Sequence, residues 1–399
     1  AQYRAAMAER HRWRERYMPG GGRPSRALHV TLDLGLPPEV VPEPPPGGPP
    51  RAALAIEQAR GSIAAMVGAD PGRLLITSGA TESDNLAVLG VARGQRDRGR
   101  HVITSRGEHR AVIDACRQLE KEGFEVTWLK PERAGCVEPW QVLEALREDT
   151  LLVSVMHANN ETGALCDLAP IGAACQARGT LLHVDAAQSA GKLPLDVGAL
   201  GVDLLAFTAH KLGGPKGIGA LACSERALAA LQPLQFGGGQ ERGLRSGTSA
   251  THQVLGFGLA ATLAVEAMQA ESDRVSGLRE RLWSRLQSVG GVWRNSPAEG
   301  CLPGTLNLGF EGVEGESLML AIRSGVWASS GSACASASAE PSYVLRAMGL
   351  SDLACQASLR LSLGRWTEAD EVDRAAVLIA GAVERLRERA PPGVRSRIR

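Results

Sequence analysis

A lysine at the end of an apolar run is the first residue in this chain that could do covalent chemistry. Lys211 lies in AFTAHKLGGPKGIGAL (206–221), where VDLLAF (202–207) predicts a short buried strand and residues 213–215 predict a turn. Open α/β sheets bind ligands at the ends of their strands. A partly desolvated amine there loses its proton more easily and can form a Schiff base. Taken alone, such a lysine is more often a solvated loop residue.

Two other loops carry groups that complement this lysine. SGATES (78–83) opens a predicted helix with small residues, so its backbone N–H groups and Thr81 could hold a phosphate, although a helix cap is the ordinary use of such a sequence. Asp185 ends the apolar run of HVDAAQ, about one strand–helix–strand unit before Lys211. A Schiff-base lysine, an aspartate for a ring nitrogen and a helix N-terminus for a phosphate are what pyridoxal phosphate (PLP) requires. Together these residues predict a PLP site.

Other polar residues near these loops are ambiguous on their own. Gln188 follows Asp185 by three positions, and His109 and His210 precede predicted helical or turn segments. Asn160 lies in HANNET, where turn formation is the ordinary use of asparagine. They gain functional weight only if the fold brings them to the same edge as Lys211.

Strands that alternate with helices would bring them there. We expect short strands at LLIT (74–77), within 101–105 and in four further apolar runs that end near residues 130, 157, 185 and 208, with helical stretches between several of them. Such alternation predicts an α/β domain with a mostly parallel, doubly wound sheet. We assign residues 53–252 to this large domain, 253–290 to a long helix, 291–390 to a smaller α+β domain and 391–399 to a basic tail.

Composition narrows the classes of partner and site. The 399 residues carry 44 Lys and Arg against 43 Asp and Glu, which gives no electrostatic case for nucleic acid or an anionic membrane. No apolar run approaches the roughly 18 residues of a membrane span. The eight cysteines are scattered without metal-ligand spacing, so we expect no metal site and no disulfide framework. Free cysteines suit a reducing compartment, and we expect a cytoplasmic protein, with a mitochondrial location less favoured.

One cysteine differs from the others in its surroundings. Cys334 lies in ASSGSACASASAEPS (328–342), which is built almost entirely from Ser, Ala and Gly. A segment with so little apolar surface predicts a mobile loop, on which a thiol could move between a buried site and an external acceptor. A small buried hydrophobe, the usual state of a free cysteine, fits this flanking sequence poorly.

Six segments in order resemble one known family, the cysteine desulfurases of the NifS/IscS kind within class V of the fold-type-I PLP enzymes. They are TSGATESDN, MHANNETG, HVDAAQSAGKLPLD, HKLGGPKGIGAL, GGGQERGLRSGT and SSGSACASASAEPSYVLRAMG. The resemblance covers residues 53–388 approximately. It implies a large domain with a seven-stranded, mostly parallel sheet, helices on both faces and a smaller α+β C-terminal domain.

The resemblance also implies roles for individual residues. Lys211, Cys334 and His109 would be catalytic, and Asn160 and Arg360 would bind the substrate, the guanidinium pairing with its carboxylate. Thr248 would reach the phosphate from the second subunit of a homodimer. The implied PLP contacts are Gly79, Ala80, Thr81, His109, Asn160, Asp185, Gln188, Thr208, His210, Lys211 and Thr248.

The implied activity is removal of sulfur from L-cysteine, which yields L-alanine and a persulfide on Cys334. Sulfur would then pass to an acceptor protein, such as an iron–sulfur scaffold or a tRNA-thiolation relay. Selenocysteine lyase and another class V aminotransferase remain alternatives, although an aminotransferase leaves the SGSAC loop unexplained.

Residues 1–52 depart from the family's pattern. They are rich in Arg, Pro and Gly, and we expect a mobile segment there. The family's usual N-terminal motifs, which help to wall the substrate pocket, are replaced. A frame shift that recovers near Arg51 is one hypothesis for the abrupt change, and a non-catalytic sulfur-transfer scaffold is a functional alternative that follows from it.

Overall fold

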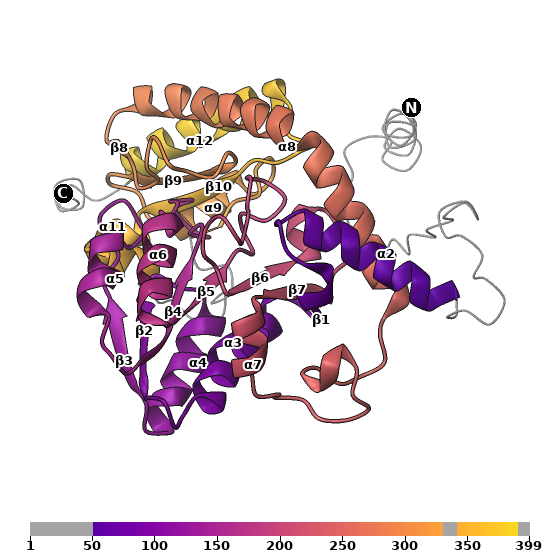
Figure 1. Cartoon of the computed structure of the whole chain (residues 1–399). Coiled ribbons are helices and arrows are strands. Elements are labelled where there is room, and N and C mark those ends of the chain that lie inside the picture. The colour runs from indigo at the N-terminus through magenta and orange to yellow at the C-terminus, as the bar shows by residue number, and fades with distance from the viewer. Residues whose placement is uncertain (1–50, 330–340, 390–399) are drawn as a thin grey trace. The chain divides into compact units, whose positions relative to one another are not determined.

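The computed structural model describes residues 51–329 and 341–389, which all fall within one compact unit (Figure 1). The predicted N-terminal segment, the Cys334 loop and the basic tail therefore lie outside the described residues, apart from their flanking positions. No described helix is both long and apolar enough to cross a membrane.

A seven-stranded sheet forms the centre of the larger part, in the order β1-β7-β6-β5-β4-β2-β3. Strands β2 to β6 pair in parallel with their neighbours, whereas β7 runs antiparallel to both β1 and β6. The predicted mostly parallel sheet is thus confirmed. The strands are β1 (Leu74–Thr77), β2 (His101–Ser105), β3 (Glu125–Leu129), β4 (Thr150–Met156), β5 (Leu181–Asp185), β6 (Leu204–Thr208) and β7 (Gly219–Cys223).

Helices cover both faces of this sheet, as predicted. Buried residues of α2 (Arg51–Ala65), α6 (Leu168–Arg178) and α8 (Thr251–Leu286) form one apolar core, while α3 (Ala80–Gly94), α4 (Arg110–Lys121) and α7 (Glu225–Ala230) pack into a second. Strand residues alternate between the two cores, so Leu75 faces one and Ile76 the other. The near-continuous burial of the strands follows from this double cover. The short α5 (Pro139–Ala145) lies before β4.

A smaller antiparallel sheet follows in the order β10-β9-β8. Its core joins the C-terminal half of α8 to residues of β9, α9 and α12. The elements are β8 (Val292–Arg294), β9 (Thr305–Phe310), α9 (Gly315–Ile322), α10 (Tyr343–Ala347), α11 (Asp352–Gln356), β10 (Ser358–Ser362) and α12 (Ala369–Arg389). An α+β segment after the long helix is confirmed, whereas the domain boundaries given above stay predictions.

The strand count from periodicity alone fell short by one, because β7 begins at Gly219 within a glycine-rich stretch. A Cβ at Gly219 would lie 2.6 Å from the backbone of Gly79, so only glycine fits this close approach. The two glycines therefore bring β7 against the turn that opens α3.

A buried ion pair ties α2 to the edge of the large sheet. Arg60 donates Nη1 and Nη2 to the two carboxylate oxygens of Glu241 at 2.8 and 2.9 Å, and the Ile76 backbone N–H donates to the same carboxylate at 2.9 Å. Only 11% of the Arg60 side chain and 8% of the Glu241 side chain are exposed.

We expect Glu241→Ala to lower the free energy of unfolding by about 3 kcal/mol, because it leaves the Arg60 charge partly buried and unpaired. The matched control is Glu57→Ala, since Glu57 also pairs with Arg60 but is 65% exposed; it should cost about 0.5 kcal/mol or less. Urea denaturation of both variants measures the difference, and equal losses would contradict this account of the pair.

Candidate active site

A cavity of about 570 Å³ opens at the carboxyl edge of the large sheet. It is lined mainly by the turns after β1, β2, β4, β5 and β6, and also by Arg360 of β10 and Tyr343 of α10. The structure brings together eleven of the residues predicted from the sequence, namely Gly79, Ala80, Thr81, His109, Asn160, Asp185, Gln188, Thr208, His210, Lys211 and Arg360. Thr248 is exposed and does not line this cavity, and Cys334 lies outside the described residues.

The N-terminus of α3 forms one end of the cavity. Helix α3 begins at Ala80, and its N-cap Gly79 has φ 156° and makes no side-chain cap, which leaves the first backbone N–H groups for another acceptor. In the first turn, Glu82 accepts from the Ser78 N–H at 2.7 Å and pairs with Arg245 at 2.7 Å. This pairing offsets a negative charge that would otherwise oppose an anion at the helix N-terminus.

Thr208 and His210 lie beside this end. Thr208 Oγ1 donates to the Ile218 carbonyl at 3.1 Å and is 3.0 Å from His210 Nδ1. Because the hydroxyl proton is used on the carbonyl, His210 Nδ1 carries the hydrogen that Thr208 accepts. Burial, followed by the neighbouring Lys211, lowers the pKa of His210, which favours the neutral ring.

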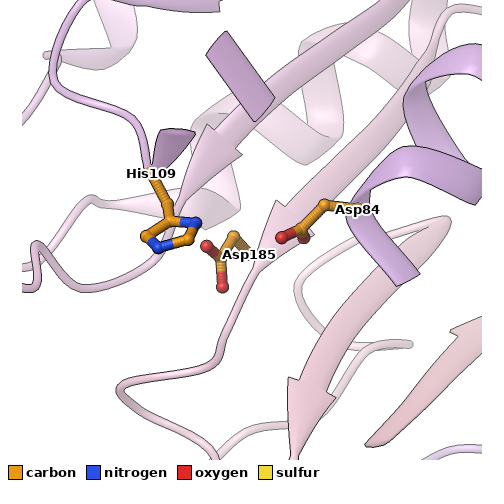
Figure 2. A group of neighbouring side chains, drawn as sticks. All are labelled: Asp84, His109 and Asp185. Carbon is orange, nitrogen blue, oxygen red and sulfur yellow. The ribbon is translucent and has the colours of Figure 1, made fainter. Parts of the chain in front are cut away.

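Asp185, His109 and Asp84 converge at another side of the cavity (Figure 2). One carboxylate oxygen from each aspartate and one ring nitrogen of His109 all lie within 4.8 Å of one another. Asp185 ends β5 and accepts from the Ala187 N–H at 2.8 Å. Burial, and next the neighbouring Asp84 carboxyl group, raise the pKa of Asp185 to about 7. These donor types also occur around metal ions, but their place in a large cavity beside a lysine favours a bound organic ring.

His109 is held by the helix it caps. Its Nδ1 accepts from the Ala111 N–H at 3.2 Å at the start of α4, so the ring hydrogen of the neutral form lies on Nε2. The ring is therefore anchored on one nitrogen and faces the cavity from the β2–α4 turn.

Arg360 enters the cavity from β10. Its Nη1 donates to the Asn160 carbonyl at 2.8 Å, and its Nε is buried without a hydrogen-bond partner among the described residues. Asn160 Oδ1 is likewise buried without one. Both polar atoms lie beside the cavity. A ligand carboxylate could accept from Arg360 Nε, and a neighbouring ligand amine could donate to Asn160 Oδ1.

Lys211 lies in the 3₁₀ turn Ala209–Leu212, directly after β6. It borders the large cavity and also a second one of about 250 Å³, which Gln188 and Lys192 line as well. Burial, and then the Lys211 charge, lower the pKa of Lys192 to about 8. The strand end and turn predicted around Lys211 are thus present.

Sequence reasoning missed several residues of the cavity wall. Lys216, which follows the turn at residues 213–215, also lines it. Tyr343 donates its hydroxyl to the Glu108 carbonyl at 2.8 Å, and the Arg110 guanidinium lies 4.5 Å from the Tyr343 ring centre. Arg110 directly follows His109, and Tyr343 ends the EPSY sequence of the last of the six segments. Their closeness to predicted site residues in the sequence was the signal that could have identified them. The other missed residues are Ser78, Glu82, Asp84, Met156, Ala158, Glu161, Ala187 and Gly217.

Residues 50–375 match the model of the aminotransferase class-V family. The chain belongs to this family. It is 50% identical over 341 residues to the cysteine desulfurase IscS of Pectobacterium atrosepticum. The matched region covers 86% of this chain and 84% of that protein. The resemblance drawn from the six motifs is thereby confirmed at the level of the family.

Solved structures are similar as well. A NifS-like protein matches with a TM-score of 0.77 and 34% identity, over 84% of this chain and 88% of that one. A structure titled SspA in complex with cysteine matches with a TM-score of 0.70 and 37% identity, over 80% and 89%. These likenesses confirm the predicted fold class.

Proposed function

We propose that this protein is a PLP-dependent cysteine desulfurase, which converts L-cysteine to L-alanine and leaves a persulfide on Cys334. One observation carries the proposal: Lys211, Asp185 and the N-terminus of α3 line a single cavity, although they follow three different strands. Cysteine desulfurase relatives at 50% identity support the same activity.

The cavity suits PLP in its chemistry. The first turn of α3, with Gly79, Ala80 and Thr81, would take the phosphate together with Thr208 and His210. The Asp185 carboxylate would accept from the protonated ring nitrogen, Gln188 would donate to the ring oxygen, and His109 would lie against the ring. PLP, when bound, supplies an electron sink that makes the Cα proton of an amino acid removable.

The residues of the chain then divide the remaining work. Lys211 Nζ would hold the cofactor covalently between turnovers and would move the Cα proton once the substrate amine has displaced it. Arg360 would bind the substrate carboxylate through its unpartnered Nε, and Asn160 Oδ1 would accept from the substrate amine. Their position fixes which bond of the substrate faces Lys211.

Sulfur transfer is a displacement at the substrate sulfur. The Cys334 thiolate attacks that sulfur, so an S–S bond forms as the Cβ–S bond breaks. The released electron pair passes to the substrate carbon skeleton, which is protonated and leaves as L-alanine. The persulfide keeps the sulfur for an acceptor, such as an iron–sulfur scaffold or a tRNA-thiolation relay.

We further propose a cytoplasmic homodimer. The exposed position of Thr248, outside its own cavity, supports the expectation that this residue serves the cavity of a second subunit.

The deciding experiment uses the purified full chain with added PLP. We expect yellow protein that releases alanine and sulfide from L-cysteine in the presence of a reductant. Lys211→Ala should lose turnover, whereas Lys121→Ala, an exposed lysine on α4, should keep it. Yellow protein without turnover would leave only the sulfur-transfer scaffold, and faster alanine release from selenocysteine would indicate the lyase.

Cys334→Ser tests the persulfide step by itself. Cofactor binding should be unchanged, while sulfide release falls at least about 100-fold, because a hydroxyl is a poor nucleophile toward sulfur. Cys136→Ser is the matched control, since Cys136 is only partly buried and lies outside the cavity. Full turnover in Cys334→Ser would rule out the proposed carrier.

Arg360→Lys should raise KM for L-cysteine about tenfold or more with a smaller change in kcat. Lysine keeps the positive charge but cannot present a forked pair of donors to a carboxylate. Steady-state kinetics measure the change, with the exposed Arg323→Lys as the control. An unchanged KM with a reduced kcat would assign Arg360 to another step.

Cofactor affinity should depend on pH through Asp185. Because its pKa in the empty site is raised to about 7, Asp185 is mostly protonated at pH 6 and mostly a carboxylate at pH 8. Only the carboxylate pairs with a ring nitrogen that carries a proton, so the dissociation constant of PLP should fall by up to about tenfold from pH 6 to pH 8. Fluorescence titration of the cofactor-free chain measures it, and Asp185→Asn should lose this component of the pH dependence.

A further inference from the structure

Asp84 is a buried acidic residue in the described part of the chain whose role is still unexplained. It lies on α3 one turn after Ala80 and is 0% exposed. Neither of its carboxyl oxygens has a hydrogen-bond partner. Figure 2 shows it directed toward Asp185 from the opposite side to His109. None of the roles proposed above uses it.

The groups that face Asp84 come from two elements. From β5, His183 Nε2 lies 3.4 Å from Asp84 Oδ1, and Asp185 lies two residues further along the same strand. From the β2–α4 turn come His109 and the fully buried Glu108. No arginine or lysine pairs with Asp84 within the described residues.

A carboxylate in this place would be costly. An ionised group that is removed from water needs an opposite charge or several hydrogen bonds, and Asp84 has neither. Its acidic neighbours, Asp185 and Glu108, would repel a further negative charge. Burial accordingly raises the pKa of Asp84 well above its usual range. The stable form is therefore the neutral carboxylic acid, which has one O–H to donate.

His183 provides the acceptor for that proton. Its Nδ1 is 2.8 Å from Ser154 Oγ, while Nε2 is buried without a hydrogen-bond partner and faces Asp84. Burial lowers the pKa of His183 to about 4, so the ring is neutral. With its hydrogen on Nδ1, the ring donates to Ser154 and presents a lone pair on Nε2 to the Asp84 O–H.

The contact joins the two ends of the proposed cofactor site. Asp84 belongs to the helix whose first turn would hold the phosphate, and His183 shares its strand and its face of the sheet with Asp185. A hydrogen bond from the Asp84 O–H to His183 Nε2, which lie 3.4 Å apart, would therefore fix how far the start of α3 lies from the Asp185 carboxylate.

We propose that Asp84 is a positioning residue, a neutral carboxylic acid that donates to His183 and thereby sets the separation of the phosphate-binding helix from Asp185. The proposal rests on the proposed function. Its second consequence concerns charge: with Asp84 neutral, the negative charge of the Asp84–Asp185 pair resides on Asp185, on the oxygens that face the ring nitrogen.

Two measurements test the proposal on the full chain. The first is infrared spectroscopy of the cofactor-free protein at pH 7.5, where a protonated carboxyl gives a C=O band distinct from carboxylate bands. Asp84→Asn should remove part of this band, and Glu108→Gln, the matched control for the other buried acid, should remove a different part. This measurement needs no cofactor and no turnover.

The second measurement is the dissociation constant of PLP, together with the pH titration of the visible absorbance band of the bound PLP. Asparagine is neutral and keeps a donor, so Asp84→Asn should stay within about threefold of the parent chain. Asp84→Ala should weaken binding at least about tenfold and shift the titration of the band. His183→Ala should add little to Asp84→Ala, because both remove the same hydrogen bond. Thermal denaturation of each variant checks that it is folded.

The outcomes separate cleanly. Loss of affinity in Asp84→Asn equal to that in Asp84→Ala would overturn the neutral-acid assignment, as would an infrared band that Asp84→Asn leaves intact. Unchanged affinity and titration in Asp84→Ala would overturn the positioning role. If the parent chain itself fails to bind PLP, the proposed function fails, while the infrared result still decides the protonation of Asp84.

Discussion

The alignment of three parallel strand ends is the constraint on which the site depends. The register pairs Met156 of β4 with Asp185 of β5, and Asp185 with Ala206 of β6. Backbone bonds continue the pairing past the strand ends, from the His157 N–H to the Asp185 carbonyl and from the Ala186 N–H to the Ala206 carbonyl. These bonds hold Asp185 level with the turns that carry Asn160 and Lys211. A shift of one residue would turn the Asp185 side chain to the other face of the sheet.

Removal from water then determines the chemistry at that edge. The same burial raises the pKa of Asp185 and lowers the pKa values of Lys192 and His183. In each case the neutral form gains, because desolvation penalises charge of either sign. The charges that remain are those with partners, such as Glu82 with Arg245, and those that face the cavity.

The sequence predicted what depends on local pattern and missed what depends on packing between distant elements. Strand β1 and the position of Lys211 after β6 follow from apolar runs that end in turns. Strand β7 was missed because Gly219 is required by the backbone of Gly79, which no local pattern records. Asp84 was missed for a similar reason: an aspartate on a helix normally faces solvent, and only the packing of α3 on the sheet buries it. The order of helices and strands could therefore be predicted from the sequence, whereas the protonation states of the site residues could not.

The smaller sheet is coupled to the site through the loop after β4. The Leu302 N–H donates to the Gly163 carbonyl at 2.8 Å, Arg360 Nη1 donates to the Asn160 carbonyl at 2.8 Å, and the Ser342 hydroxyl donates to Glu161 at 2.5 Å. The proposed substrate-binding residues Asn160 and Arg360 are thus placed by contacts between segments that lie far apart in the chain, whereas Asp185, Thr208 and Lys211 belong to the large sheet and its turns. A change in the packing of β9 or β10 would consequently move Arg360 relative to the turns of the large sheet that line the cavity. The position of Arg360 in the cavity is therefore set at this junction, where the smaller sheet contacts residues 157–165.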